Sequence, residues 1–177
     1  DETMVTNYPL VDMTARVAEL NNIKYPMAGM KSHHVTLGIY DLKTQNTVFI
    51  KTGEPKEQYL TTVSWSPDEQ FIYIGVLNRD QNHLKMNKYS VETGEFIKTV
   101  FEEKDEQFVE PEHSLIFIPN QEDQFLWFSS KENYKQIYLY TTEGKQIKKI
   151  TDGEWDVTEF LGFDDKNNIY FQAATNF

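Results

Sequence analysis

Turn-forming stretches recur along this chain at a constant interval, and that interval constrains the fold more than any other feature. The threonines that mark three of these turns, Thr44, Thr93 and Thr142, lie 49 residues apart each time. Each turn separates two short runs rich in β-branched and aromatic residues, which are typical of strands. A repeat of about 40 to 50 residues with four strands per repeat is typical of a β-propeller blade.

A second series of turns alternates with the first. Its members, at Asp68, Asn120 and Asp165, are spaced by 52 and 45 residues. At the first of them, Pro67 presets the backbone φ angle for a type I turn. We expect Ser66 to make a local hydrogen bond within the same turn. The two series together predict about twelve short strands and no long amphipathic helix.

We therefore predict an all-β fold: a segment of a β-propeller with about three four-stranded antiparallel blades in an incomplete ring. The predicted parts are an arm with its leading segment (1–30), a half blade (31–56), two blades (57–108 and 109–153) and a second half blade (154–177). Because a closed propeller needs about four to eight blades, we expect a piece of a larger propeller or an assembly of copies. A β-sandwich is the alternative, but it does not explain the constant interval. The open strand edges also predict self-association.

Charge and composition exclude several classes of partner. The net charge is −11 and the pI is about 4.8, so we expect no nucleic acid, whose phosphates need a basic face. The chain has no cysteine, which excludes disulfides, thiolate metal sites and a cysteine nucleophile. No apolar run approaches the roughly 20 residues that span a bilayer. We therefore expect no direct membrane insertion.

Residues that could carry chemistry are scattered rather than grouped. His33 and His34 are adjacent, so on a strand they point to opposite faces and do not share a metal ion. His83 and His113 have no second ligand at a useful spacing. The acidic run 102–106 lacks the pattern of a calcium loop, and we interpret it as a solvated connection between blades. We predict no catalytic, metal-binding or cofactor-binding residue.

The three tryptophans, Trp65, Trp127 and Trp155, lie in or beside strands of successive repeats. Large aromatic side chains at repeated strand positions indicate packing between blades. A platform on which sugar rings stack is the alternative interpretation.

Several longer stretches have a more specific character than the turns. They are Tyr8-Pro9-Leu10-Val11, Tyr25-Pro26-Met27-Ala28-Gly29, Val35-Thr36-Leu37-Gly38-Ile39-Tyr40, Thr62-Val63-Ser64-Trp65, Asn78-Arg79-Asp80-Gln81-Asn82 and Gly153-Glu154-Trp155-Asp156-Val157. In these stretches the chain resembles the propeller domain of the dipeptidyl peptidase IV family, above all its bacterial members, among the S9 (prolyl oligopeptidase) serine peptidases. The resemblance covers nearly the whole chain.

The resemblance implies an eight-bladed propeller that caps a C-terminal α/β-hydrolase domain, the expected partner. It implies an enzyme that releases X-Pro or X-Ala dipeptides from peptide substrates, with this chain a non-catalytic part that gates and orients them. The family's amine-holding glutamates would precede Asp1, and Glu110-Pro111-Glu112-His113 stands where other members have a substrate-contacting arginine, so neither role is assigned here. No Gly-x-Ser-x-Gly nucleophile motif occurs.

The same resemblance suggests where the longer protein is found and how it assembles. We expect a periplasmic, cell-envelope or secreted location. An exported propeller that serves as a protein-interaction scaffold without peptidase activity is the alternative function. The segment 12–24 corresponds to a projecting arm that contributes to homodimers in the family. Apolar arm residues that we predict to form a homo-oligomer contact, unless they pack on their own blade, are Val11, Met13, Val17, Leu20 and Ile23.

Overall fold

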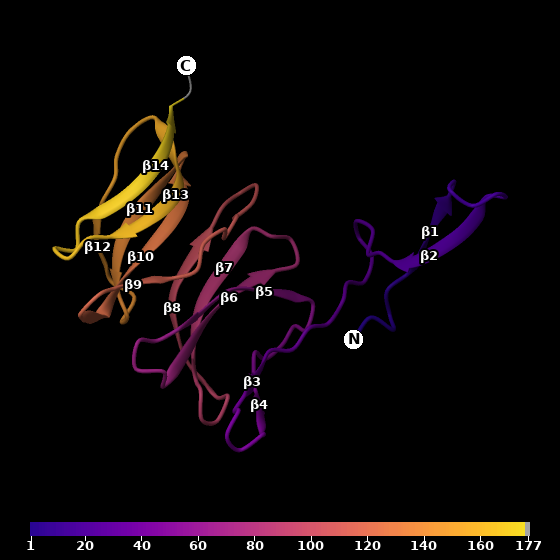
Figure 1. Cartoon of the computed structure of the whole chain (residues 1–177), viewed down its shortest axis with the longest axis horizontal. Coiled ribbons are helices and arrows are strands. Elements are labelled where there is room, and N and C mark those ends of the chain that lie inside the picture. The colour runs from indigo at the N-terminus through magenta and orange to yellow at the C-terminus, as the bar shows by residue number, and fades with distance from the viewer. Residues whose placement is uncertain (176–177) are drawn as a thin grey trace.

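The computed structural model describes residues 1–175 of the chain. These residues form fourteen β-strands and no helix, and therefore contain no helix long and apolar enough to cross a membrane. All paired strands are antiparallel. They form five sheets, which follow one another in chain order along an open arc (Figure 1).

Two of the sheets have four strands, and in each the strands lie side by side in chain order. The first sheet contains β5 (Gln58–Trp65), β6 (Phe71–Asn78), β7 (His83–Ser90) and β8 (Phe96–Lys104). The second contains β9 (Ile116–Ile118), β10 (Gln121–Glu132), β11 (Tyr134–Thr141) and β12 (Gln146–Lys149). We call these sheets blade A (β5–β8) and blade B (β9–β12).

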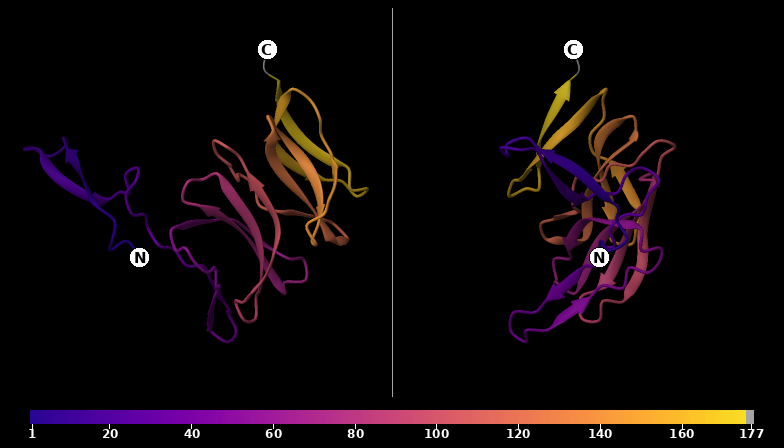
Figure 2. Two further views of the ribbon diagram at one scale, coloured as in Figure 1. Left: turned by 180° about the vertical axis from the view of Figure 1, so that it is seen from behind. Right: turned by 90° about the vertical axis from the view of Figure 1, so that its right-hand side faces the viewer.

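The other three sheets are two-stranded hairpins. They are β1 (Asn7–Asp12) with β2 (Glu19–Lys24), β3 (Gly38–Tyr40) with β4 (Thr47–Phe49), and β13 (Trp155–Phe163) with β14 (Ile169–Thr175). The predicted limits after residues 30, 56, 108 and 153 all fall in the connections between sheets. The β1–β2 hairpin projects away from the remaining sheets (Figures 1 and 2).

Among the described residues, apolar clusters fill the three spaces between successive sheets from β3–β4 to β13–β14. Neighbouring residues of a strand point to opposite faces, so β6 gives Tyr73 to the cluster between the two blades and Ile72 and Ile74 to the cluster beside β3–β4. A third cluster, which includes Leu126 and Val157, joins blade B to β13–β14. Because both faces of each blade are covered, β6 and the middle of β10 are near-continuous apolar runs.

The turn at Ser66 shows how local chemistry sets the hairpin between β5 and β6. The Ser66 hydroxyl donates to Asp68 Oδ1 at 2.5 Å and accepts from the Phe71 backbone N–H at 2.9 Å. The first bond orients the hydroxyl, and the second satisfies a backbone N–H that the turn removes from the strand ladder. The prediction of a local turn role for Ser66 is confirmed.

Two glycines seat the outer turn of one sheet on the last strand of the sheet before it. A Cβ on Gly94 would lie 2.2 Å from the Phe49 carbonyl oxygen, and a Cβ on Gly144 would lie 1.8 Å from that of Val100. Both glycines have positive φ angles, of +70° and +92°, a region that L side chains rarely adopt. We call each of these contacts a glycine clasp. Each one needs both the missing side chain and the left-handed backbone.

The structure corrects several local predictions. Trp65 does not pack between sheets within the described residues, because its side chain is 48% exposed on the side of β5 that faces the short β3–β4 hairpin. Trp127 and Trp155 do pack between sheets, as predicted. The described residues form fourteen strands instead of about twelve. The second half of the predicted arm forms strand β2.

Candidate functional site

The connection from β8 to β9, residues 105–115, crosses from the last strand of blade A to the first strand of blade B. We call it the strap. At its start, the Asp105 backbone N–H donates to the Asn82 carbonyl at 3.1 Å, and that of Val109 donates to the Gln81 carbonyl at 2.7 Å. Both acceptors belong to the turn between β6 and β7 of blade A. The first half of the strap is therefore fixed to blade A by backbone bonds.

The far end of the strap is also tied to blade A. The Leu115 N–H donates to the Ser64 hydroxyl at 2.9 Å, and the Ser114 hydroxyl donates to the Val63 carbonyl at 3.3 Å. Ser64 follows a bulge in β5, where the register with β6 shifts between Thr61 and Ser64. Bulges redirect a strand's side chains and free its backbone groups. Because β5 is also an edge strand of blade A, its groups can bond to the strap outside their own sheet.

A third anchor joins the strap to the opposite blade. The Lys135 ammonium at the start of β11 pairs with the Glu112 carboxylate of the strap. The Lys135 backbone N–H donates to Asp156 Oδ1 of β13 at 2.6 Å. Lys135 thus connects the strap, blade B and the last hairpin through one residue.

Two hollows flank the strap. The larger, of about 410 Å³, lies between the end of β8 and the turn from β10 to β11, and the smaller, of about 370 Å³, lies against β5 and the end of β6. Val109 and Glu110 line both hollows, so this part of the strap is the wall between them. Spaces of this size are typical of sites for small ligands or peptide side chains.

A partly buried carboxylate lines the larger hollow. Burial raises the pKa of Glu103, while hydrogen bonds from Ser129 and Trp127 and the nearby charge of Lys131 lower it in part. The indole N–H of Trp127 donates to Glu103 Oε1 at 2.8 Å. The sequence interpretation of 102–106 as a solvated connection is therefore wrong at its start. The residues up to Lys104 belong to β8, and Glu103 faces the interior.

Lys131 places a positive charge at this hollow. Its ammonium donates to the Tyr140 hydroxyl at 2.9 Å and to Gln146 Oε1 at 2.5 Å, and lies 4.0 Å from the Tyr138 ring centroid. Burial lowers the pKa of Lys131, and the carboxylate of Glu103 raises it in part. Each of these two charges of opposite sign therefore favours the ionised form of the other.

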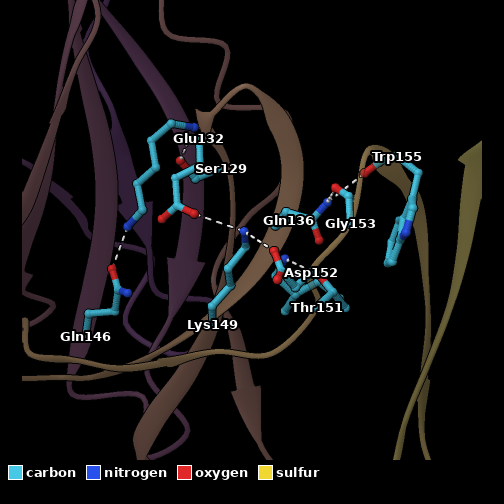
Figure 3. Close-up of polar contacts among 11 residues, drawn as sticks. Ser129, Glu132, Gln136, Gln146, Lys149, Thr151, Asp152, Gly153 and Trp155 are labelled. Carbon is cyan, nitrogen blue, oxygen red and sulfur yellow. Dashed lines mark hydrogen bonds and ion pairs between the residues drawn. The ribbon is translucent and has the colours of Figure 1, made fainter. Parts of the chain in front are cut away.

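A second lysine ties the same turn to the far edge of blade B. The Lys149 ammonium bonds Glu132 at 2.9 Å and Asp152 at 2.6 Å (Figure 3). Hydrogen bonds to these two carboxylates raise the pKa of Lys149. The turn between β10 and β11, which forms one side of the larger hollow, is thereby held at both ends.

The Gly-x-Trp-Asp-Val stretch identified in the sequence closes this region. The fully buried Gln136 side chain donates to the carbonyls of Trp155 at 2.6 Å and Gly153 at 3.3 Å (Figure 3). The Thr151 hydroxyl accepts the Ile137 N–H at 2.9 Å. A Cβ on Gly153 would lie 1.9 Å from Trp155 Nε1. The glycine is needed because the indole packs directly against it.

The structure places the predicted arm residues on the projecting β1–β2 hairpin. Four of the five are exposed, Met13 most of all at 85%, and Ile23 is half-buried. Among the described residues, no other sheet covers Val11, Met13, Val17 and Leu20. Their role as a homo-oligomer contact stays a prediction.

The remaining candidates lie apart from one another. The His83 Nε2 lies 2.6 Å from the Glu102 carboxylate, and the His33 Nε2 lies 3.5 Å from that of Glu2. Within residues 1–175, no three His, Cys, Asp or Glu side chains are grouped so that they could hold a metal ion. The sequence reasoning missed the strap anchors and the Glu103–Lys131 pair. The one sequence signal that could have indicated these residues was a lysine or glutamate next to the apolar run of a strand.

Sheets packed face to face along an arc, with outer turns seated on the preceding sheet, define this chain as part of a β-propeller. A family model described as the dipeptidyl peptidase IV (DPP IV) N-terminal region matches residues 1–176. The chain belongs to this family, and the predicted resemblance is confirmed.

Solved relatives share the fold over almost the whole chain. The crystal structure of a protein assigned as a dipeptidyl aminopeptidase IV from Bacteroides ovatus is 41% identical, with a TM-score of 0.90, and the match covers 98% of this chain and 27% of that one. The crystal structure of Porphyromonas gingivalis dipeptidyl peptidase 4 is 26% identical, with a TM-score of 0.83, and covers 98% and 25%. The predicted fold, an all-β propeller segment with an incomplete ring, is confirmed.

Among curated proteins, a dipeptidyl-aminopeptidase B of Phaeosphaeria nodorum is 27% identical over 204 residues, covering 99% of this chain and 22% of the relative. A dipeptidyl peptidase 4 of Trichophyton rubrum is 25% identical over 162 residues, covering 88% and 21%. The chain thus spans about a fifth of the length of these curated relatives.

Proposed function

We propose that this chain is a non-catalytic propeller segment of a dipeptidyl peptidase IV, which gates and orients peptide substrates. A separate C-terminal α/β-hydrolase domain supplies the serine nucleophile and releases N-terminal X-Pro and X-Ala dipeptides. The observation that carries this proposal is the strap, a wall fixed at both ends and flanked by two hollows, in a chain of the DPP IV family. The hollows offer shape and charge, which can orient a peptide. They offer no activated nucleophile among the described residues.

Activity measurements test this proposal directly. The full-length protein is expected to release the chromophore from Gly-Pro and Ala-Pro substrates, and to lose this activity when the substrate's amine is acetylated. The 177-residue polypeptide alone is expected to give no turnover. Hydrolysis by the isolated polypeptide that survives repurification would contradict the non-catalytic assignment. A full-length protein inert toward both substrates would instead favour an exported interaction scaffold.

We also propose that the β1–β2 arm forms the contact between two copies of the full-length protein, which we place in the periplasm or cell envelope or outside the cell. Exposed apolar side chains on a projecting hairpin favour association. Replacing Leu20 and Ile23 with aspartate together is expected to convert a dimer into a monomer in light scattering. The matched control is Ile147→Asp, at a half-exposed apolar position on β12 far from the arm. A dimer that persists in the arm variant, or dissociates equally in the control, would refute the assignment.

A further inference from the structure

His113 occupies an unusual position on the strap. Its ring lies against Phe128 of β10, with centroids 4.5 Å apart and planes inclined by 40°. Its Nε2 atom is shielded from solvent and makes no hydrogen bond with any residue in the described part of the chain. A neutral imidazole can leave one nitrogen unprotonated. In that form the buried Nε2 is an uncharged acceptor, and the only cost of its burial is one hydrogen bond that it does not accept.

Protonation changes this balance. The imidazolium carries a proton on both nitrogens, so the buried Nε2 would become a charged donor without an acceptor, which is strongly unfavourable in an apolar environment. The charged groups that face the ring are Glu112 on the strap and Lys135 of β11. Phe128, the contact from β10, contributes no charge. Since Lys135 already pairs with Glu112, the nearest carboxylate is shared with a competing cation.

The direction of the effect follows from these contacts. Burial lowers the pKa of His113, and of the two charges Glu112 opposes the shift while Lys135 adds to it. A released, solvated imidazole titrates near its usual value of about 6.5. The seated strap is therefore fully favoured above about pH 6.5 and loses stability relative to the released strap as the pH falls below it.

We infer that His113 makes the strap a pH-dependent wall: protonation of its imidazole releases the strap and joins the two hollows that Val109 and Glu110 separate. Release lets the imidazolium reach water and the Glu112 carboxylate. The Lys135–Glu112 pair is then weakened, and the strap loses its anchor on blade B. The Asp105–Asn82 backbone bond remains as the hinge on blade A, while the Val109–Gln81 and Leu115–Ser64 bonds break.

Hydrogen–deuterium exchange of the full-length protein tests this inference without any measurement of activity. Labelling times are scaled for intrinsic exchange at pH 7.5 and pH 5.5. Peptides that contain the Val109 and Leu115 amides are expected to lose protection by up to about tenfold for each pH unit below 6.5. His113→Phe is expected to abolish this pH response. The matched control is His83→Gln, which alters a histidine outside the strap and should keep the wild-type response.

A second measurement remains decisive if the His113→Phe variant does not fold. Exchange at the imidazole C2 position, followed by mass spectrometry against pH, gives the titration midpoint of His113 in the wild-type protein. A midpoint below about 6.5 supports the inference. A midpoint at or above that value, or strap protection that is the same at both pH values, overturns it.

Discussion

Gly144→Ala is expected to lower the free energy of unfolding of the full-length protein's propeller by about 3 kcal/mol or more. The new Cβ would lie 1.8 Å from the Val100 carbonyl oxygen and 2.8 Å from its carbon. Both atoms belong to the backbone of β8, so no side chain can rotate out of the way. Relief requires that the turn of blade B lift off blade A, which breaks the glycine clasp. Urea unfolding followed by tryptophan fluorescence measures the loss.

The matched control separates the clash from the strain of the left-handed backbone. Gly53 also has a positive φ angle, +78°, but a Cβ there would meet nothing within 4 Å. Gly53→Ala should therefore lower the free energy of unfolding by only about 1 kcal/mol, the cost of placing an L side chain on a left-handed backbone. Equal losses for the two variants would show that contact with the preceding sheet does not matter. Gly94→Ala should behave like Gly144→Ala, since its Cβ would lie 2.2 Å from the Phe49 carbonyl oxygen.

Trp127→Ala is expected to destabilise the propeller by about 3 to 5 kcal/mol, the usual range for a large aromatic side chain removed from a core. Trp127 is 1% exposed, lies in the cluster between the two blades and contacts the Phe101 ring at 5.3 Å between centroids. Its removal leaves a cavity and takes a hydrogen bond from the partly buried Glu103 carboxylate. Thermal unfolding monitored by circular dichroism reports the change.

Two further variants separate the contribution of the Trp127 indole hydrogen bond from that of its buried volume. Trp127→Phe keeps much of the volume and loses the indole donor, so we expect an intermediate loss that grows as the pH rises and Glu103 ionises. The matched control is Phe108→Ala on the strap, where the ring is 56% exposed and the cost should stay near 0.5 kcal/mol. A Trp127→Ala variant no less stable than the Phe108→Ala variant would contradict the assigned core.

What the sequence reveals about this fold is mostly local. The turn series and the hydrogen bond of Ser66 could be predicted because they depend on residues within a few positions of one another. The strap anchors could not, because Lys135 and Glu112 are 23 residues apart and meet only once two blades pack. Trp65 illustrates the same limit. Its strand pattern indicated a buried face, but burial depends on which sheet covers that face.

Two glycines each combine a role that depends on neighbouring residues with a role that depends on packing between sheets. Gly94 and Gly144 could be predicted as turn residues from their neighbours. Their second role, contact with the preceding sheet, depends on the angle between successive sheets, which no local pattern encodes. Glu103 and Lys131 were missed for a related reason. Each is a charged residue in or beside a strand, and only the packing of blade A on blade B brings them together.

The glycine clasps also affect the tendency of this strand-rich chain to aggregate. The last strand of a sheet normally presents free N–H and C=O groups to which a foreign strand can add. Here the turn of the next sheet occupies that edge. The Lys51 N–H just beyond β4 donates to the Gly94 carbonyl at 2.9 Å, and the backbone of Gly144 rests on that of Val100. Blade A thus shields the edge of β4, and blade B shields the edge of β8, from edge-to-edge aggregation. Variants that open a clasp should aggregate before they unfold.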